Sequence, residues 1–162
     1  MRHPAAAALA CGALLALGGC GFHLEGRTPL PAKVLTPYLE AEDRQSDFVQ
    51  SLERALLANG AQLAPDRTKA SAVLTILKDN VKPRVLSVSN LNQPNEYELT
   101  YTVSFSVTAG GEELLPPQEI STTRSYSFDA RFLLAKGHEA DILRGAMAQE
   151  LADMVMRRLA RL

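Results

Sequence analysis

The sequence predicts an α+β fold: a two-layer sandwich in which two helices cover one face of a four-stranded mixed sheet, in the order β-α-β-β-β-α. Two stretches alternate between large apolar and small polar residues, which is the period of a half-buried strand. Two others carry apolar residues at three- and four-residue steps, as a helix with one buried face does. Elements that are apolar on one side only bury those sides against one another, so two layers are expected.

The first strand is expected over residues 34–39, where Pro37 favours an edge position. Ser46 is the predicted N-cap of the helix that follows, because its hydroxyl can accept a hydrogen bond from the first turn. Asn59 and Gly60 are expected to end this helix, since both tolerate a left-handed backbone. Its apolar positions have helical spacing and comprise Phe48, Val49, Leu52, Ala55 and Leu56.

The second strand is expected over residues 72–77, with an irregular continuation past Pro83 to Val88, and a loop over residues 89–95. The third strand, over residues 97–108, is the clearest element, because its large side chains all fall on one face. They are Tyr97, Leu99, Tyr101, Val103, Phe105 and Val107. The opposite face is mainly Ser and Thr, so it is expected to face water or a polar partner.

A turn at Gly110 and Gly111 should lead into a connection that Pro116 and Pro117 keep irregular. A fourth strand, over residues 120–128, again alternates and is expected to lie antiparallel to the third. The last helix is expected from about Glu139 to the end of the chain. One apolar stripe runs along it, formed by Leu143, Met147, Leu151, Met154, Val155, Leu159 and Leu162.

Residues 1–19 have the features of a secretory signal: Arg2 and His3 precede an apolar run that is too short to span a membrane. With Gly18 and Gly19 before it, Cys20 resembles the modified cysteine of a bacterial lipobox. The resemblance implies a diacylglycerol on the Cys20 thiol and an acyl chain on its amine. The alternative is a plain secretory signal with Cys20 as a free thiol.

This processing divides the chain into a signal peptide over residues 1–19, a lipidated tether over residues 20–32 and a single domain over residues 33–162. Several acyl chains on one cysteine suffice for stable anchoring in a bilayer. Gly21 after the cysteine resembles the sorting signal for the outer membrane.

The composition excludes several classes of function. The formal net charge is −1 and no long basic run occurs, so nucleic acid is not an expected partner. After residue 19 the chain has two histidines, His23 and His138, and Cys20 is its one cysteine. These residues do not suffice for a metal site or an activated nucleophile. We therefore expect a binding or assembly protein that is not an enzyme and has no metal and no cofactor besides the lipid.

Three basic residues are candidate contacts for a ligand. Lys82 and Arg84 lie near the loop after the second strand, and Lys136 follows an apolar run. Apolar surface beside a cation suits an anionic amphiphile, and it equally suits a protein partner. Solvated surface charges are the alternative for all three.

Three segments resemble the LptE family of lipopolysaccharide-assembly lipoproteins. They are Cys20-Gly21-Phe22-His23-Leu24, Asn95-Glu96-Tyr97-Glu98-Leu99, and Ser127-Phe128-Asp129 followed by Leu134-Ala135-Lys136. The resemblance covers nearly the whole chain after residue 19. It implies a lipid-anchored protein of the Gram-negative outer membrane that plugs a β-barrel, LptD, as a one-to-one complex and assists its assembly. It also implies lipopolysaccharide binding that promotes insertion into the outer leaflet.

The family's basic lipopolysaccharide contact in the Leu-Ala-Lys segment carries over to Lys136. A second family contact lies in the loop before the long alternating strand, where this chain has Ser89, Asn90 and Leu91 instead. Lys82 or Arg84 would have to replace that contact. The rival reading is a free-standing lipoprotein carrier that holds an apolar ligand between helix and sheet.

Overall fold

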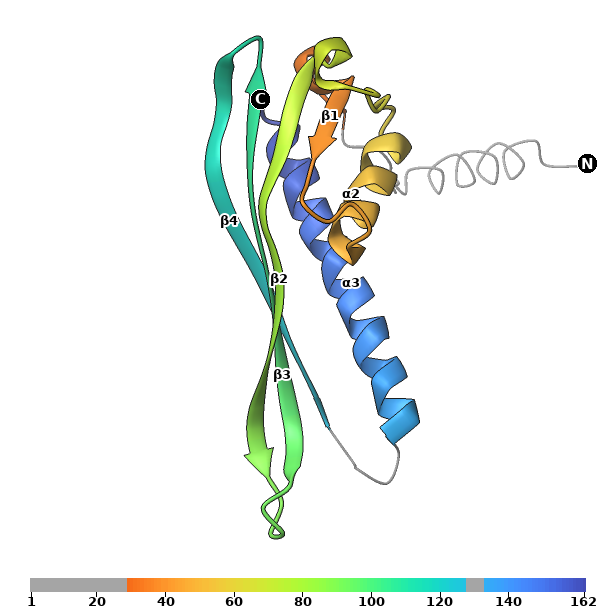
Figure 1. Cartoon of the computed structure of the whole chain (residues 1–162), viewed down its shortest axis with the longest axis vertical. Coiled ribbons are helices and arrows are strands. Elements are labelled where there is room, and N and C mark those ends of the chain that lie inside the picture. The colour runs from red at the N-terminus through yellow and green to blue at the C-terminus, as the bar shows by residue number, and fades with distance from the viewer. Residues whose placement is uncertain (1–28, 128–132) are drawn as a thin grey trace, which may run out of the picture.

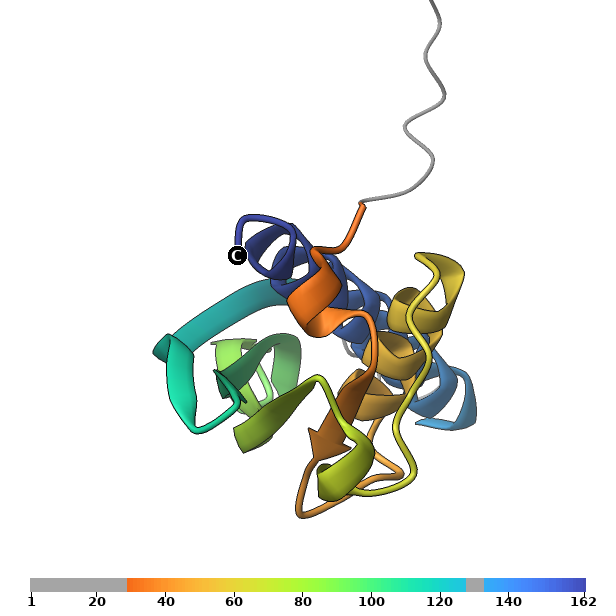
Figure 2. The same ribbon diagram turned by 90° about the horizontal axis from the view of Figure 1, so that it is seen from above.

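The computed structural model describes residues 29–127 and 133–162, and for residues 133–138 it describes the backbone alone. Four strands form one mixed sheet in the order β1-β2-β3-β4. Both helices cover the same side of this sheet (Figures 1 and 2), so the predicted α+β fold class is confirmed. The elements are β1 (Pro37–Glu40), α2 (Asp47–Ala58), β2 (Ala72–Val88), β3 (Pro94–Ala109), β4 (Glu112–Ser127) and α3 (Leu133–Leu159), with short 3-10 turns η2 (Ala32–Val34) and η3 (Arg67–Lys69).

Strand β1 lies at one edge of the sheet, as Pro37 predicted, and pairs parallel to β2. The prediction that this strand begins at residue 34 is wrong, because η2 occupies residues 32–34. The Val34 N–H donates to the carbonyl of Pro31 at 2.9 Å and closes that turn. Val34 is nevertheless buried and belongs to the core.

Helix α2 begins as predicted. The Ser46 hydroxyl accepts the Val49 N–H at 3.1 Å, which satisfies one of the free donors in the first helical turn. Gly60 follows the helix at a φ of +88°, a conformation that glycine adopts without steric cost. The predicted apolar face is fully confirmed, because all five of its residues are buried.

The long hairpin of β2 and β3 is continuous past Pro83, with a bulge between Ile76 and Lys78. The turn between β3 and β4 places Gly110 at a φ of +59° and Gly111 at +86°. Two positive φ values match the twist of a tight hairpin, so the predicted turn is confirmed.

Strand β4 corrects one prediction: it runs from Glu112 to Ser127 and includes Pro116 and Pro117, which we expected to be irregular. Phe105 pairs with Gln118 while Val107 pairs with Leu115, so both prolines lie in a bulge opposite one residue of β3. Because β4 is an edge strand, a proline without an N–H is tolerated there.

Helix α3 also begins earlier than predicted, at Leu133. Residues 133–136 are Leu, Leu, Ala and Lys, all strong helix formers, and they extend the helix toward its N-terminus. The predicted apolar stripe packs on the sheet and on α2, with Met147, Leu151, Val155 and Leu159 fully buried. Each buried side chain of this size contributes about 1.5–3 kcal/mol to stability.

The buried residues of the long hairpin lie at 72–76 on β2 and at 99–107 on β3. The β2–β3 hairpin continues beyond this core to a loop at the far end (Figure 1). Among the described residues, no helix is long and apolar enough to span a membrane.

Candidate functional site

The face of the sheet that points away from the helices is rich in hydroxyl groups. Directly paired residues of antiparallel strands share a face, and Thr102 of β3 lies between Asn80 of β2 and Ser121 of β4. The polar face comprises Lys78, Asn80, Lys82, Arg84, Glu98, Thr100, Thr102, Ser104, Glu119, Ser121, Thr123 and Ser125. An ion pair between Lys78 Nζ and Glu119 Oε2, at 3.0 Å, crosses β3 on this face.

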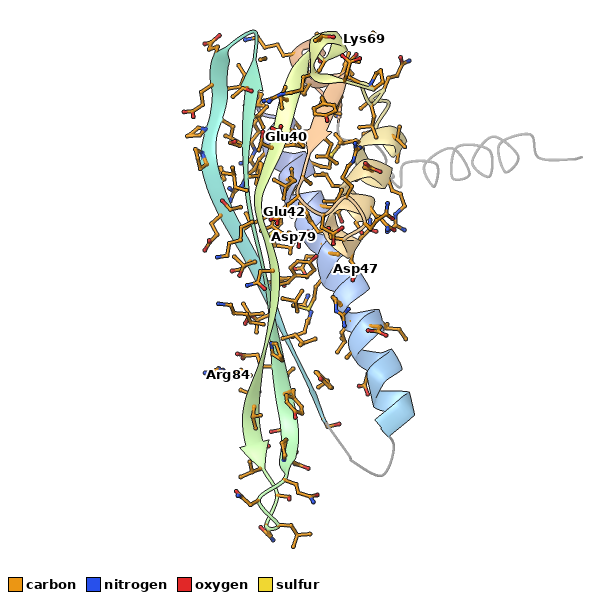
Figure 3. The ribbon with its side chains drawn as sticks, viewed as in Figure 1. Glu40, Glu42, Asp47, Lys69, Asp79 and Arg84 are labelled. Atoms are coloured by element: carbon orange, nitrogen blue, oxygen red, sulfur yellow. The ribbon has the colours of Figure 1, made fainter. Side chains whose placement is uncertain are left out.

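The structure places Lys82 and Arg84 together on the polar face, where β2 leaves the core. Their direct partners on β3 are Thr100 and Glu98. Arg84 Nη2 lies 2.8 Å from Glu98 Oε1, and the Arg84 side chain stays 70% exposed. Figure 3 shows Arg84 pointing away from the helices. Lys82 forms no ion pair with any residue that the structure describes.

Apolar side chains continue from these cations to the end of the hairpin. Val85 is 44% exposed, Val88 56% and Leu91 81%, and Leu86 is similarly exposed. Sequence reasoning did not single out this group, although four aliphatic residues between position 85 and a turn were a visible signal. Cations and exposed apolar side chains thus meet at one end of the molecule.

Two predicted site residues, Lys136 and Cys20, lie wholly or partly outside what the structure describes. Lys136 lies in the first turn of α3, and its side chain is outside the described residues. That helix begins at the same end of the long axis as the β2–β3 loop (Figure 1). Cys20 falls outside the described ranges altogether. Proximity of Lys136 to Lys82 and Arg84 therefore stays a prediction.

A cleft of about 530 Å³ opens on the helical side of the sheet. Its walls come from the start of α2, the middle of β2 and β3, the end of β4 and α3. The lining residues are Asp43, Ser46, Asp47, Asp79, Asn80, Val81, Pro83, Leu99, Tyr101, Tyr126, Ala140 and Arg144. Figure 3 shows Asp79 on β2 at about the same level as Asp47 on α2. This cleft was not predicted from the sequence, because its carboxylates come from distant segments.

Burial of Tyr101, reinforced by the neighbouring Asp79 carboxylate, raises the pKa of this phenol well above its ordinary value. The Asp79 carboxylate also accepts the Ser46 hydroxyl at 2.5 Å. Over the described side chains, no group of three His, Cys, Asp or Glu residues has the arrangement of a metal site. Acidic and apolar side chains together line the cleft.

The chain is similar in sequence to a known protein family and to curated proteins. The family model described as "LptE: Lipopolysaccharide-assembly" matches residues 36–159, which include β1 to β4, α2 and the whole of α3. The LPS-assembly lipoprotein LptE of Pectobacterium atrosepticum is 27% identical over 148 residues, which span 91% of this chain and 80% of that protein.

Two solved structures share the fold. Lipoprotein B of Nitrosomonas europaea has a TM-score of 0.70 at 27% identity, covering 86% of this chain and 90% of its own. The rare lipoprotein B of Shewanella oneidensis has a TM-score of 0.67 at 27% identity, covering 78% of this chain and 94% of its own. Both of these proteins are described as lipoproteins.

Proposed function

We propose that this chain, which belongs to the LptE family of lipopolysaccharide-assembly proteins, is the lipoprotein partner of an LptD-type outer-membrane β-barrel. In this role it occupies the lumen of the barrel as a plug, one copy for each barrel, and assists the assembly of the barrel. The curated relatives that it matches are named LPS-assembly lipoproteins. The role requires a binding surface and no catalytic residue.

The observation that carries the plug proposal is the hydroxyl-rich face of the sheet. Thr100, Thr102, Ser104, Ser121 and Thr123 present short polar side chains there. The lumen of a large outer-membrane barrel is polar and water-filled. A polar face can lie against such a wall with its hydrogen bonds satisfied by the wall or by bridging water.

We propose further that the end of the molecule with the β2–β3 loop binds lipopolysaccharide and promotes its insertion into the outer leaflet. Lys82 and Arg84 supply cations for the phosphates of an anionic glycolipid. Val85, Val88 and Leu91 supply exposed apolar surface for its acyl chains. In this proposal Lys136 adds a third cation from the start of α3.

We also propose that diacylglyceryl and acyl chains on Cys20 anchor the protein in the outer membrane of a Gram-negative bacterium. More than one chain is needed for stable anchoring, and a triacylated cysteine meets that requirement. Leu30, the first buried residue within the described ranges, lies ten positions after Cys20. An extended tether spans at most about 3.3–3.6 Å per residue, so the domain would stay close to the membrane.

The rival function, a carrier of an apolar ligand, is less well supported by the structure. The cleft between α3 and the sheet is large enough for a small ligand. However, Asp43, Asp47 and Asp79 line it, and burying such carboxylates under an apolar ligand without partners costs free energy.

The test is a pull-down of the tagged, lipidated protein from detergent-solubilised outer membranes, followed by mass spectrometry. The proposal predicts an LptD-type barrel in equal molar amount. Recovery of the protein alone, with lipid bound, would reject the plug and favour the carrier.

A further inference from the structure

The acidic cleft opens on the helical side of the sheet, and Val81 and Pro83 in its lining alternate along β2 with Lys82 and Arg84 of the polar face. Its apolar floor is formed by Val81, Leu99 and Tyr126, one residue from each of three adjacent strands. Ala140 and Arg144 of α3 form the opposite wall. Its volume of about 530 Å³ lies within the range of sites that hold a ligand or a few side chains.

The charges of the cleft select for a cation. Asp43, Asp47 and Asp79 have no ion-pair partner among the residues that the structure describes. The cation in the lining is Arg144, and its Nη2 atom already pairs with Asp141 at 2.9 Å. Because Asp43 and Asp79 accept hydrogen bonds but none of the three carboxylates pairs with a described cation, they repel an anionic amphiphile and attract Lys or Arg.

A bare strand edge beside the cleft favours a polypeptide over a small cation. β1 pairs with residues 72–75 of β2, and from there to Val88 no strand of residues 29–127 or 133–162 pairs with β2 on that side. An exposed edge presents backbone donors and acceptors on which an extended peptide can pair. Pro83 lacks an N–H, so an added strand would bond on either side of that position.

Because the side chains of a strand point alternately to the two faces of a sheet, each face of β2 selects the residue types at alternate positions of the bound peptide. Asp79 and Val81 lie on the helical face of β2, and Lys82 and Arg84 lie on the polar face. Side chains of an added strand point alternately to these two faces. Residues toward the cleft should therefore be basic or apolar, and those toward Lys82 and Arg84 should be acidic or polar.

We propose that this edge and cleft bind an extended segment of a partner polypeptide, which adds to β2 and inserts Lys or Arg and apolar side chains into the cleft. This site goes beyond the proposed plug and lipopolysaccharide functions. It is defined by complementary charge and by a free backbone edge.

The experiment measures binding of synthetic peptides to the full-length protein purified in detergent. In the probe peptide every second residue is Lys or Val, and the residues between them are Glu or Thr. The peptide also carries a terminal Trp, whose fluorescence reports binding directly because the protein contains no Trp. We expect saturable binding that weakens about tenfold in the Asp43→Asn/Asp47→Asn variant. The matched control, Glu112→Gln/Glu113→Gln at the distant β3–β4 turn, should bind as the unchanged protein does.

Failure of the probe to bind would overturn the proposal, and so would equal binding to the Asp43→Asn/Asp47→Asn variant. Complete displacement of the probe by spermidine would also overturn it, because that result would indicate a small-cation site. A probe methylated on alternate backbone nitrogens tests the edge, since it cannot form the strand ladder, and equal binding of this probe would reject strand addition. Thermal unfolding of each variant verifies that it is folded. These assays need no barrel, so their failure differs from a failure of the plug proposal.

Discussion

The hydroxyl of Ser46 lies 2.5 Å from Oδ2 of Asp79, so the first turn of α2 is tied directly to the middle of β2. The same hydroxyl accepts the Val49 N–H at 3.1 Å. One serine therefore caps the helix and satisfies a carboxylate of the sheet. This joint also sets the position of Asp47 relative to Asp79, and with it the acidic wall of the cleft.

Replacement of Ser46 by Ala removes both hydrogen bonds. We expect Ser46→Ala to lower the free energy of unfolding by about 1–2 kcal/mol, the usual effect of losing a polar N-cap. Urea unfolding followed by circular dichroism measures this change. Ser46→Thr retains a hydroxyl and should stay within about 0.5 kcal/mol of the unchanged protein. Equal stability of the Ala and Thr variants would contradict the role of the joint.

Tyr101 should make stability depend on alkaline pH. Its pKa is raised from 10.0 by burial and then by Asp79, so the folded state holds this proton more tightly than the unfolded state. The stabilisation is complete below the unfolded pKa and is lost as pH rises through the folded pKa. We therefore expect the free energy of unfolding to fall above about pH 10.

The matched variant is Tyr101→Phe, which keeps the ring and removes the titrating hydroxyl. Its stability should decline less steeply over the same pH range, because the remaining tyrosines and lysines are unchanged. Denaturant titrations at several pH values measure both slopes. Parallel curves for the two proteins would show that Tyr101 does not carry the effect.

Charge reversal at Lys82 and Arg84, in the second half of β2, should weaken glycolipid binding. We expect Lys82→Glu/Arg84→Glu to reduce lipopolysaccharide affinity about tenfold, since two phosphate-binding cations become repulsive. Lys136→Asp should act in the same direction. The control is Arg54→Glu on α2, which lies on the helical layer. Binding to immobilised lipopolysaccharide, with thermal unfolding in parallel, distinguishes lost affinity from lost structure. Unchanged affinity in both hairpin and Lys136 variants would make these residues ordinary surface charges.

Removal of the lipid anchor should leave the domain intact. We expect Cys20→Ala to be folded and to fractionate with soluble periplasmic protein, because the core that the structure describes is built from Leu30 and later residues. Cell fractionation measures the location of the variant, and circular dichroism measures whether it is folded. A variant that stays in the membrane fraction after a salt wash would show a further anchor.

Local patterns predicted the elements whose causes are local. The alternation of β3 needs no neighbour to be recognised, and the cap at Ser46 lies within one helical turn. In contrast, the bulge that accommodates Pro116 and Pro117 depends on how β4 is registered against Ser106 and Val107. The turn at residues 32–34 likewise replaced a strand that apolar composition favoured.

The candidate sites also differ in whether local sequence or the packing of distant segments determines them. Lys82 and Arg84 were predicted from their place after an apolar strand, and β2 carries them onto one face. The acidic cleft was not predicted, because Asp43 lies in a loop, Asp47 in a helix and Asp79 in a strand. Only the packing of α2 against β2 brings these three carboxylates together.

The central claim is that the hydroxyl-rich face of the sheet lies against the wall of a barrel. The most direct measurement is the molar ratio of LptD-type barrel to lipoprotein recovered by a tagged Thr102→Trp variant. Trp is well tolerated in strands, so the variant should fold, while its bulk at the centre of the face should prevent close contact. We predict a ratio near one for the unchanged protein and for a Gln50→Trp control, and a large loss for Thr102→Trp. An undiminished ratio with Thr102→Trp would contradict the assignment of this face to the barrel.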